Sequence, residues 1–147
     1  MKFFTTALLS AAAVSAENTA YEVRDFTASC IPHSKFCNYK FRVLQPGTME
    51  TWKYAMHCSA HIWSDDYLLP NVKNAQCGDG SERTFSVKRS KNGLSLYVSE
   101  SVTTISYLIG KHFIPNKQLW QSKTPKAEIQ VYKGPKDFNL DYVHSME

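Results

Sequence analysis

Residues 21–43 read YEVRDFTASCIPHSKFCNYKFRV, and no other stretch of the chain says more about the fold. Two runs rich in β-forming residues flank a short loop that begins at Cys30 and ends at Cys37. Pro32 and Ser34 favour a turn between the two cysteines. The pattern therefore predicts a strand, a loop closed by a disulfide, and a returning strand.

The two arms of this hairpin differ in regularity. The second arm alternates as a half-buried strand does, and its apolar face carries Cys37, Tyr39, Phe41 and Val43. In the first arm Tyr21 and Val23 share one face, but the apolar positions then continue on the other face, at Phe26, Ala28 and Cys30. This change of face predicts a bulge or bend near Asp25.

The N-terminal residues 1–16 have the features of a secretory signal peptide. Lys2 supplies a positive charge, a short apolar run follows, and small residues precede Glu17. No later stretch approaches the roughly 18 consecutive apolar residues of a membrane span. We therefore expect an exported, extracellular protein that forms a single domain over residues 17–147 and does not interact with membranes.

The cysteines of the chain number four, all in the expected mature part. An even number in an exported protein favours disulfides over metal ligation or thiol catalysis, although spacing alone leaves three connectivities. We expect Cys30 to pair with Cys37 and Cys58 with Cys77. In the chain-entropy treatment, loops of these lengths contribute about 2.5 and about 3.3 kcal/mol to stability.

The net charge of the chain is +4, which is mild, and basic residues are interspersed with aspartates and glutamates. This distribution does not resemble a nucleic-acid-binding surface, and we expect no nucleic-acid partner.

The rest of the chain shows repeated strand and turn signals. A strand is expected over residues 52–62, followed by a loop over residues 64–76. Asn92-Gly93 predicts a tight hairpin turn, with Leu94, Leu96 and Val98 after it. A second reversal is expected at residues 99–101, and it leads into a strand over residues 102–109.

Towards the C-terminus, Gly110 is expected to end that strand, and residues 111–126 to form a long connection. Two further alternating runs follow, around Ala127, Ile129 and Val131 and around Phe138, Leu140 and Tyr142. Eight or so strands without a convincing amphipathic helix predict an all-β fold. We expect a compact antiparallel β-barrel or a closely related sandwich, stapled by two disulfides.

Residues that could carry chemistry do not form a convincing constellation. His57 and His61 share a strand face but would lie ~13 Å apart, too far for one metal ion. His33 stands beside Ser34, but no acid or oxyanion donor is recognisable nearby. Asp65-Asp66 suits a loop. We therefore predict no catalytic residue, no metal site and no cofactor.

Trp63 falls on the same strand face as His57 and His61. If it is exposed there, it could anchor a partner, because tryptophan is prominent among binding hot spots.

Four segments, YEVRDFTASCIPHSKFCNYKF, HCSAHIW, the Gln-Cys-Gly before a strand, and GLSLYVSESVTTISYLI, together resemble the Alternaria major allergen family. These are small secreted proteins of filamentous fungi. The resemblance covers residues 21–114 and is closest, in the first segment, to the elicitor-like branch.

This resemblance implies a compact antiparallel barrel without a catalytic site. Members are allergens, trigger plant defence responses, or bind plant defence proteins such as the thaumatin-like class. The family's central disulfide falls on Cys58 and Cys77, and Cys30 and Cys37 match the loop-closing pair of the elicitor-like branch. The allergen branch has a further cysteine pair in its C-terminal third, whereas this chain has no cysteine after Cys77.

The leading hypothesis is a secreted fungal effector or elicitor that presents loops to a plant extracellular protein. The loops in question are residues 31–36, 64–76 and 111–126. A second hypothesis is a carrier that holds a small apolar or phenolic ligand in the barrel. A third is a small secreted hydrolase such as a ribonuclease, which would use one of the five histidines, His33, His57, His61, His112 or His144.

Overall fold

The computed structural model describes residues 18–122 and 129–146, and the expected signal peptide lies outside this part. The described chain is almost entirely β-structure. Its elements are β1 (Thr19–Cys30), β2 (Phe36–Leu44), η1 (Trp52–Tyr54), β3 (Met56–Trp63), β4 (Val72–Gln76), β5 (Thr84–Ser90), β6 (Gly93–Ser101), β7 (Tyr107–Pro115), η2 (Asn116–Gln118), β8 (Leu119–Gln121), β9 (Gln130–Tyr132) and β10 (Phe138–Val143).

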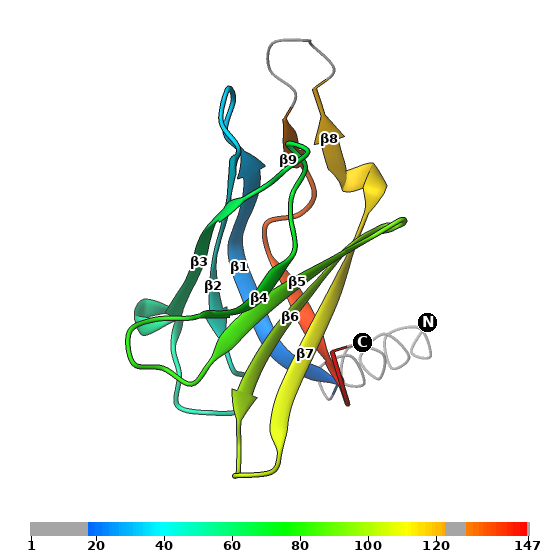
Figure 1. Ribbon diagram of the computed structural model, residues 1–147. Helices are drawn as coiled ribbons and strands as arrows, with labels where there is room; N and C mark the ends of the chain where they lie inside the picture. Colours follow the sequence, from blue (N-terminus) through cyan, green and yellow to red (C-terminus); the bar gives the residue numbers. More distant parts are fainter. Residues whose placement is uncertain (1–17, 123–128, 147) are drawn as a thin grey trace, which may run out of the picture.

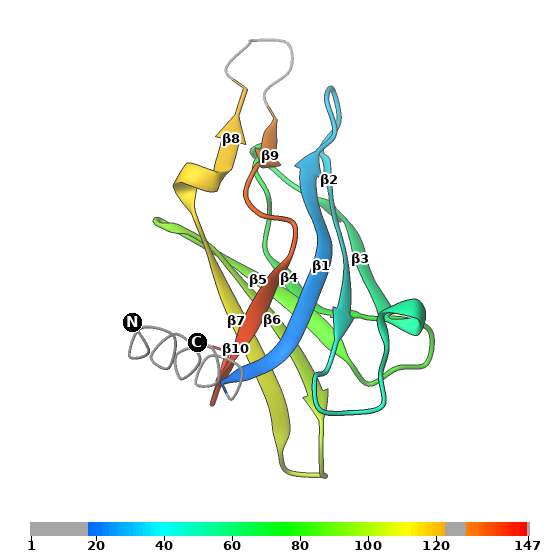
Figure 2. The same ribbon diagram turned by 180° about the vertical axis from the view of Figure 1, so that it is seen from behind.

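Eight strands form a nearly closed antiparallel barrel in the order β3-β2-β1-β10-β7-β6-β5-β4 (Figures 1 and 2). The seam lies between β3 and β4, where a single bridge joins Cys58 to Cys77. At this bridge the backbone N–H of Gly78 donates to the carbonyl of His57 at 3.0 Å. The β8–β9 hairpin extends beyond one end of the barrel (Figure 1). The expected fold class is thus confirmed, and closure identifies it as a barrel.

The opening hairpin has the predicted structure. β1 pairs with β2 from Glu22 to Cys30, and the register shifts between Arg24 and Thr27. At this bulge Asp25 takes a left-handed conformation, with φ of 58°. The bulge lets both apolar sets of β1 face the interior, where Tyr21, Val23, Phe26, Ala28 and Cys30 are all buried.

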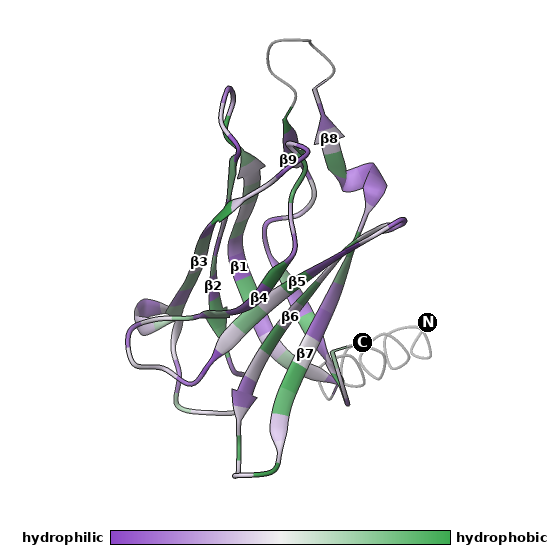
Figure 3. Cartoon of the chain, viewed as in Figure 1, coloured by the Kyte–Doolittle hydropathy of each residue, from purple (hydrophilic) through white to green (hydrophobic). Residues whose placement is uncertain are grey.

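The interior of the barrel is filled by large side chains. Phe26 contacts Phe41, Tyr132 and Phe138 through ring packing, and Phe41 packs edge-on against Phe85. Figure 3 shows hydrophobic colours recurring along the strands, while η2 is hydrophilic. The largest fully buried side chains are Arg83, Tyr21, Tyr39, Tyr97, Phe26, Phe41, Phe85, Leu69, Leu94, Leu96, Ile114 and Leu140.

The strand expected over residues 52–62 begins later than its alternation suggests. Trp52–Tyr54 forms the 3-10 turn η1, and Tyr54 is 80% exposed. The guanidinium of Arg24 lies 4.3 Å from the centre of the Trp52 ring, and that of Arg42 lies 5.4 Å from it. These cation–π contacts hold Trp52 outside the barrel, so only β3 (Met56–Trp63) continues the sheet.

The expected loop over residues 64–76 ends in a strand. Val72–Gln76 forms β4 and pairs with β5, with a register shift where Asn74 takes a φ of 49°. The alternation did not show this strand, because Val72 is its only buried residue and the bulge breaks its period.

The hairpin predicted at Asn92-Gly93 exists, but its turn lies one residue earlier. Ser90 pairs with Gly93, so Lys91 and Asn92 form the loop, and neither has a positive φ. Glycine is needed at position 93 for another reason: φ is 151°, and a Cβ would overlap the carbonyl oxygen of Ile114. The reversal expected at residues 99–101 lies further along the chain, because β6 extends to Ser101.

The expected end of a strand at Gly110 is wrong, because β7 (Tyr107–Pro115) runs straight through this residue. Much of the connection expected over residues 111–126 is therefore strand, followed by η2 and β8. In the run expected around residue 127, Ala127 lies outside the described part and β9 begins at Gln130. The last alternating run is β10, which pairs with β1 and β7.

Gly110 is required by packing. A Cβ at this position would lie 2.8 Å from Cβ of Leu140 and 2.9 Å from Cδ2 of Tyr21. We expect Gly110→Ala to lower the free energy of unfolding by about 1–3 kcal/mol, because the methyl group overpacks the core. Denaturant unfolding measures this loss. Gly47→Ala is the control: its φ is 76°, but the added methyl meets open space. The loss for Gly47→Ala reports only the strain of alanine at this positive φ, and a Gly110→Ala variant as stable as the unmodified protein would contradict the assignment.

Candidate functional site

The loops of interest from the sequence meet at one end of the barrel, which we call the loop end. It consists of residues 31–35, between β1 and β2, and residues 64–71, between β3 and β4, next to the β8–β9 hairpin (Figure 1). In the sequence, β2 and β3 lie between these two loops. The structure joins them by direct side-chain bonds.

The loop of residues 64–71 is fixed to β5 by an ion pair. The Asp66 carboxylate accepts two hydrogen bonds from the Arg89 guanidinium, at 3.1 and 2.6 Å, and another from the backbone N–H of Leu68 at 3.2 Å. The bonds from Arg89 hold the pKa of Asp66 below its usual value. An exposed pair adds little stability by itself, but two parallel bonds fix the direction of the loop.

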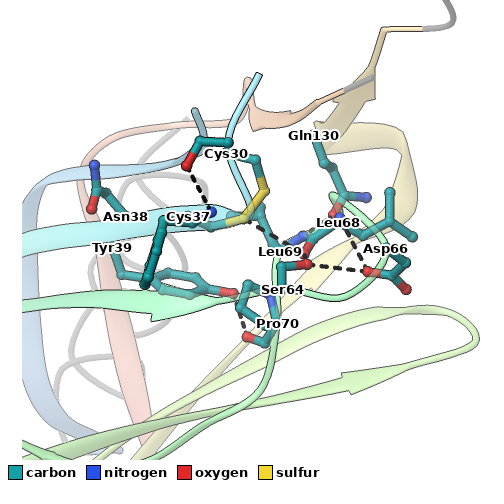
Figure 4. Close-up of a disulfide and its surroundings, with 12 residues drawn as sticks. Cys30, Cys37, Asn38, Tyr39, Ser64, Asp66, Leu68, Leu69, Pro70 and Gln130 are labelled. Atoms are coloured by element: carbon teal, nitrogen blue, oxygen red, sulfur yellow. Dashed lines mark hydrogen bonds between the residues drawn. A yellow bond between two sulfur atoms is a disulfide. The ribbon is translucent and has the colours of Figure 1, made fainter. Parts of the chain in front are cut away.

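Core side chains hold the inner side of the same loop (Figure 4). The Tyr39 hydroxyl donates to the carbonyl of Pro70 at 2.7 Å, and the Gln130 side-chain oxygen accepts from the N–H of Leu69 at 2.8 Å. Burial raises the pKa of Tyr39, so this hydroxyl remains a donor. Ser64 donates to the carbonyl of Leu68 at 2.6 Å. Side chains of the barrel therefore hold the loop in place.

The two loops also hold each other. The Lys35 ammonium donates to the backbone carbonyl of Asp65 at 2.9 Å and lies 4.3 Å from the centre of the Tyr67 ring. The N–H of Ser64 donates to the carbonyl of Lys35 at 2.6 Å. His33 and Tyr67 have positive φ, at 61° and 63°. Backbone strain at non-glycine residues is enriched at binding sites.

An exposed aromatic group lies on the outer face beside the loop end. The Phe36 ring stacks on His61 at 4.5 Å and meets Trp63 edge-on at 5.5 Å. Trp63 is 54% exposed, and its indole N–H donates to Asp65 Oδ1 at 2.7 Å. Nδ1 of His61 lies 2.6 Å from Oδ1 of Asn38. The outward position of Trp63 is thus the one that the alternation of β3 predicts.

The five histidines are dispersed over the molecule. His57 and His61 project outward from β3, and His33 occupies the β1–β2 turn. His112 stacks on Phe138 at 3.9 Å, where burial lowers its pKa, and His144 contacts Tyr142. Within residues 18–122 and 129–146, no histidine forms an ion pair with a carboxylate. In the same part of the chain, no cluster of three or more potential ligands could hold a metal ion.

A second charged cluster, at the opposite end of the barrel, was not visible in the sequence. Arg83 is 1% exposed, and its guanidinium donates to both oxygens of Glu50 at 3.0 Å and to Glu100 at 3.3 Å. It lies 5.2 Å from the centre of the Tyr21 ring. Burial opposes its charge, but the bonds and charges of the two glutamates outweigh this effect and raise the pKa of Arg83. The cluster closes the interior and is structural.

The sequence could not have linked the members of either charged cluster. Asp66 and Arg89 lie 23 positions apart, and Arg83 lies 33 positions from Glu50. No spacing rule covers such separations, so only the tertiary structure reveals the pairs. Among the described residues, no helix is long and apolar enough to cross a bilayer.

The fold and this surface define a class of protein: a small disulfide-stapled antiparallel barrel that presents rigid loops at one end. Both expected disulfides are present, Cys30–Cys37 and Cys58–Cys77. Disulfides of this kind are typical of proteins matured in an oxidising compartment.

Two solved structures of an allergen share this fold. The crystal structure of the Alternaria alternata allergen Alt a 1 superposes with a TM-score of 0.55 at 17% identity, covering 86% of this chain and 88% of the allergen chain. A second crystal structure of the Alternaria alternata major allergen Alt a 1 gives a TM-score of 0.52 at 17% identity, over 86% and 94% of the two chains. No family model and no curated protein sequence matches the chain. The resemblance seen in the sequence is confirmed at the level of the fold.

Proposed function

We propose that this chain is a secreted fungal effector or elicitor of the Alternaria major allergen family, in its elicitor-like branch. It binds a plant extracellular defence-related protein, such as one of the thaumatin-like class, and so triggers or modulates plant immune responses without catalysis. The observation that carries this proposal is the loop of residues 64–71, fixed by Asp66, Arg89, Tyr39 and Gln130.

A preformed loop surface suits protein binding. Association costs free energy for every side chain and loop that must be ordered, and a loop already held by its own barrel avoids most of this cost. The half-buried side chain of Lys35 joins the two loops: it donates to the carbonyl of Asp65 and lies over the ring of Tyr67. We assign the contact surface to these two residues and their neighbours.

The carrier hypothesis is less well supported. Aromatic and aliphatic side chains fill the barrel interior, and Arg83 with its two glutamates closes one end. The hydrolase hypothesis is also weaker, because the histidines are dispersed and none forms an ion pair with a carboxylate within the described residues.

Export and maturation follow from the same proposal. The signal-like residues 1–16 would direct the chain out of the cell, and the two disulfides would then form in an oxidising environment. The expected working form is thus the oxidised protein of residues 17–147.

We expect the oxidised protein to capture one saturable protein from plant extracellular fluid. The double variant Lys35→Ala/Tyr67→Ala should lower the affinity for the purified captured protein by about tenfold or more, because it removes the half-buried Lys35–Tyr67 contact of the loop end. Mass spectrometry identifies the captured protein, and calorimetry with the purified pair gives the affinity.

Two controls make this experiment decisive. Ile105→Ser changes a residue that is 91% exposed in the β6–β7 turn, at the other end of the barrel, and should leave binding unchanged. A reduced and alkylated sample should capture nothing specific. If no plant protein is captured, the proposed function is wrong; if Ile105→Ser alone weakens binding, the loop end is not the contact surface.

A further inference from the structure

A polar hollow lies beside the exposed ring of Trp63. Its volume is about 390 Å³, and it opens to solvent next to the loop of residues 64–71. Its lining combines one aromatic ring with carboxylate, amide, guanidinium and hydroxyl groups, from Trp63, Ser64, Asp65, Asp66, Pro70, Asn71 and Arg89. A solvent-open hollow lined mainly by fixed polar groups, with one aromatic ring among them, matches a ligand that carries many hydroxyl groups around a small apolar face.

The ring of Trp63 is fixed in advance. The indole N–H of Trp63 is bonded to Asp65 at 2.7 Å, and the ring packs against Phe36 in a T-shaped contact with ring centres 5.5 Å apart. A ring with little remaining freedom loses little conformational entropy on binding. The exposed indole surface therefore forms a platform on which the C–H face of a sugar ring can stack.

The rim of the hollow retains unused hydrogen-bonding capacity. Asp65 uses only Oδ1 for Trp63, and Asn71 uses its side-chain oxygen to accept from the N–H of Arg89 at 2.6 Å. Among the described residues, neither Asp65 Oδ2 nor the amide nitrogen of Asn71 has a hydrogen-bond partner. One charged acceptor and one amide donor can thus bind adjacent hydroxyl groups.

The charges around the hollow favour a neutral ligand. Arg89 is neutralised by Asp66, with two bonds between them. Lys35 donates to the backbone carbonyl of Asp65, so within the described part of the chain the carboxylate of Asp65 has no cation bonded to it. An acidic sugar placed against this carboxylate would be repelled, whereas hydroxyl groups would be attracted.

The surface continues beyond the hollow along the outer face of β2 and β3. The register places Phe36 opposite Trp63, and the outward pairs that follow are Asn38 with His61, Lys40 with Ser59, and Arg42 with His57. From Trp63 to His57 this row spans ~20 Å of strand, enough for several linked sugar rings. The face is polar, with Phe36 and Trp63 at the hollow and Trp52 beside Arg42 at its far end, which suits an extended chain.

We propose that the Trp63 hollow and the adjoining outer face of β2 and β3 bind a neutral oligosaccharide, such as a segment of a structural polysaccharide. Trp63 stacks on one sugar ring, while Asp65 and Asn71 bind its hydroxyl groups. This site goes beyond the proposed binding of a plant protein. It would hold the secreted protein at a polysaccharide surface.

Calorimetric titration of the oxidised protein with chitohexaose, cellohexaose and laminarihexaose tests the proposal, with hexagalacturonate as the acidic probe. We expect saturable binding of at least one neutral hexasaccharide. Trp63→Ala should weaken this binding by about tenfold or more, and Asp65→Asn by about threefold or more, because asparagine keeps the bond to the indole but loses the charge. Trp63→Phe keeps a stacking ring and should bind more tightly than Trp63→Ala.

Trp120→Ala is the matched control. Trp120 is 53% exposed, like Trp63, but lies on β8, outside the hollow, so its loss should leave binding unchanged. Near-ultraviolet circular dichroism confirms that each variant is folded. The proposal is overturned if no neutral hexasaccharide binds at millimolar concentration, if hexagalacturonate binds more tightly than all of them, or if Trp63→Ala binds like the unmodified protein. If no oligosaccharide binds, the capture of a plant protein through Lys35 and Tyr67 is still tested by its own experiment.

Discussion

Replacing Cys58 and Cys77 together by alanine is expected to lower the free energy of unfolding by about 3.3 kcal/mol. The disulfide closes a loop with a sequence separation of 19 residues. It also lies at the barrel seam, where its two cysteines form an isolated bridge between β3 and the residue that follows β4. The loss is a large share of the roughly 5–15 kcal/mol that stabilises a typical domain.

The Cys30–Cys37 disulfide provides a matched comparison. Its loop has a sequence separation of 7 residues, and its two cysteines are already opposite each other in the β1–β2 ladder. Removing it should cost about 2.5 kcal/mol at most, because hydrogen bonds still hold the strands together.

Guanidinium unfolding of both double variants measures the two losses. Hydrogen exchange should also become faster in β3 and β4 of Cys58→Ala/Cys77→Ala, because the seam can then open locally. An equal or greater loss on removing Cys30–Cys37 would show that the seam does not depend on its disulfide.

Arg83→Met is expected to cost about 3–5 kcal/mol at neutral pH. The substitution removes three hydrogen bonds and leaves Glu50 and Glu100 facing a space without a cation. Methionine fills much of the volume but cannot balance the two carboxylates. Arg24→Met, at an exposed arginine, should cost only about 0.5–1 kcal/mol, because it loses a cation–π contact with Trp52.

The cost of Arg83→Met should depend on pH in a defined direction. Hydrogen bonding to Arg83 holds the pKa of Glu50 below its usual value. The resulting stabilisation is fully present above the ordinary glutamate pKa of about 4.3 and is lost as the pH falls through the lower value in the folded protein. The variant lacks this stabilisation, so its deficit relative to the unmodified protein should narrow below about pH 4.

Thermal and denaturant unfolding between neutral and acidic pH measure this deficit for both arginine variants. If the loss of unfolding free energy in Arg83→Met stays constant down to acidic pH, Arg83 does not lower the pKa of Glu50. A loss no larger than that of Arg24→Met would mean that the buried cluster is unimportant for stability.

The opening hairpin could be predicted in detail from sequence because its determinants are local. Alternation with a period of two fixes the faces of β2, and the change of face in β1 reveals the bulge at Asp25. Cys30 and Cys37 lie near enough in sequence for their turn to pair them. The candidate site was less accessible: the sequence pointed to residues 31–36 and 64–76 and to Trp63, but not to what holds them.

Two predictions were wrong because long-range packing overrode a local signal. Gly110 looked like the end of a strand, but it is a point where β7 passes close to Leu140 and Tyr21. Trp52 continued the alternation of β3, yet two arginines from β1 and β2 hold it outside. In both cases the deciding partner comes from a distant part of the chain.

Residue period and local turn signals were enough to predict the all-β class and the first hairpin, whereas cysteine spacing left three connectivities open for the two disulfides. The tertiary structure decided the closure at Cys58–Cys77, the Asp66–Arg89 anchor, the buried Arg83 cluster and the hollow beside Trp63. Each of these depends on which strands become neighbours. The free energy of the whole packed core decides which strands become neighbours, and no single stretch of the sequence contains that information.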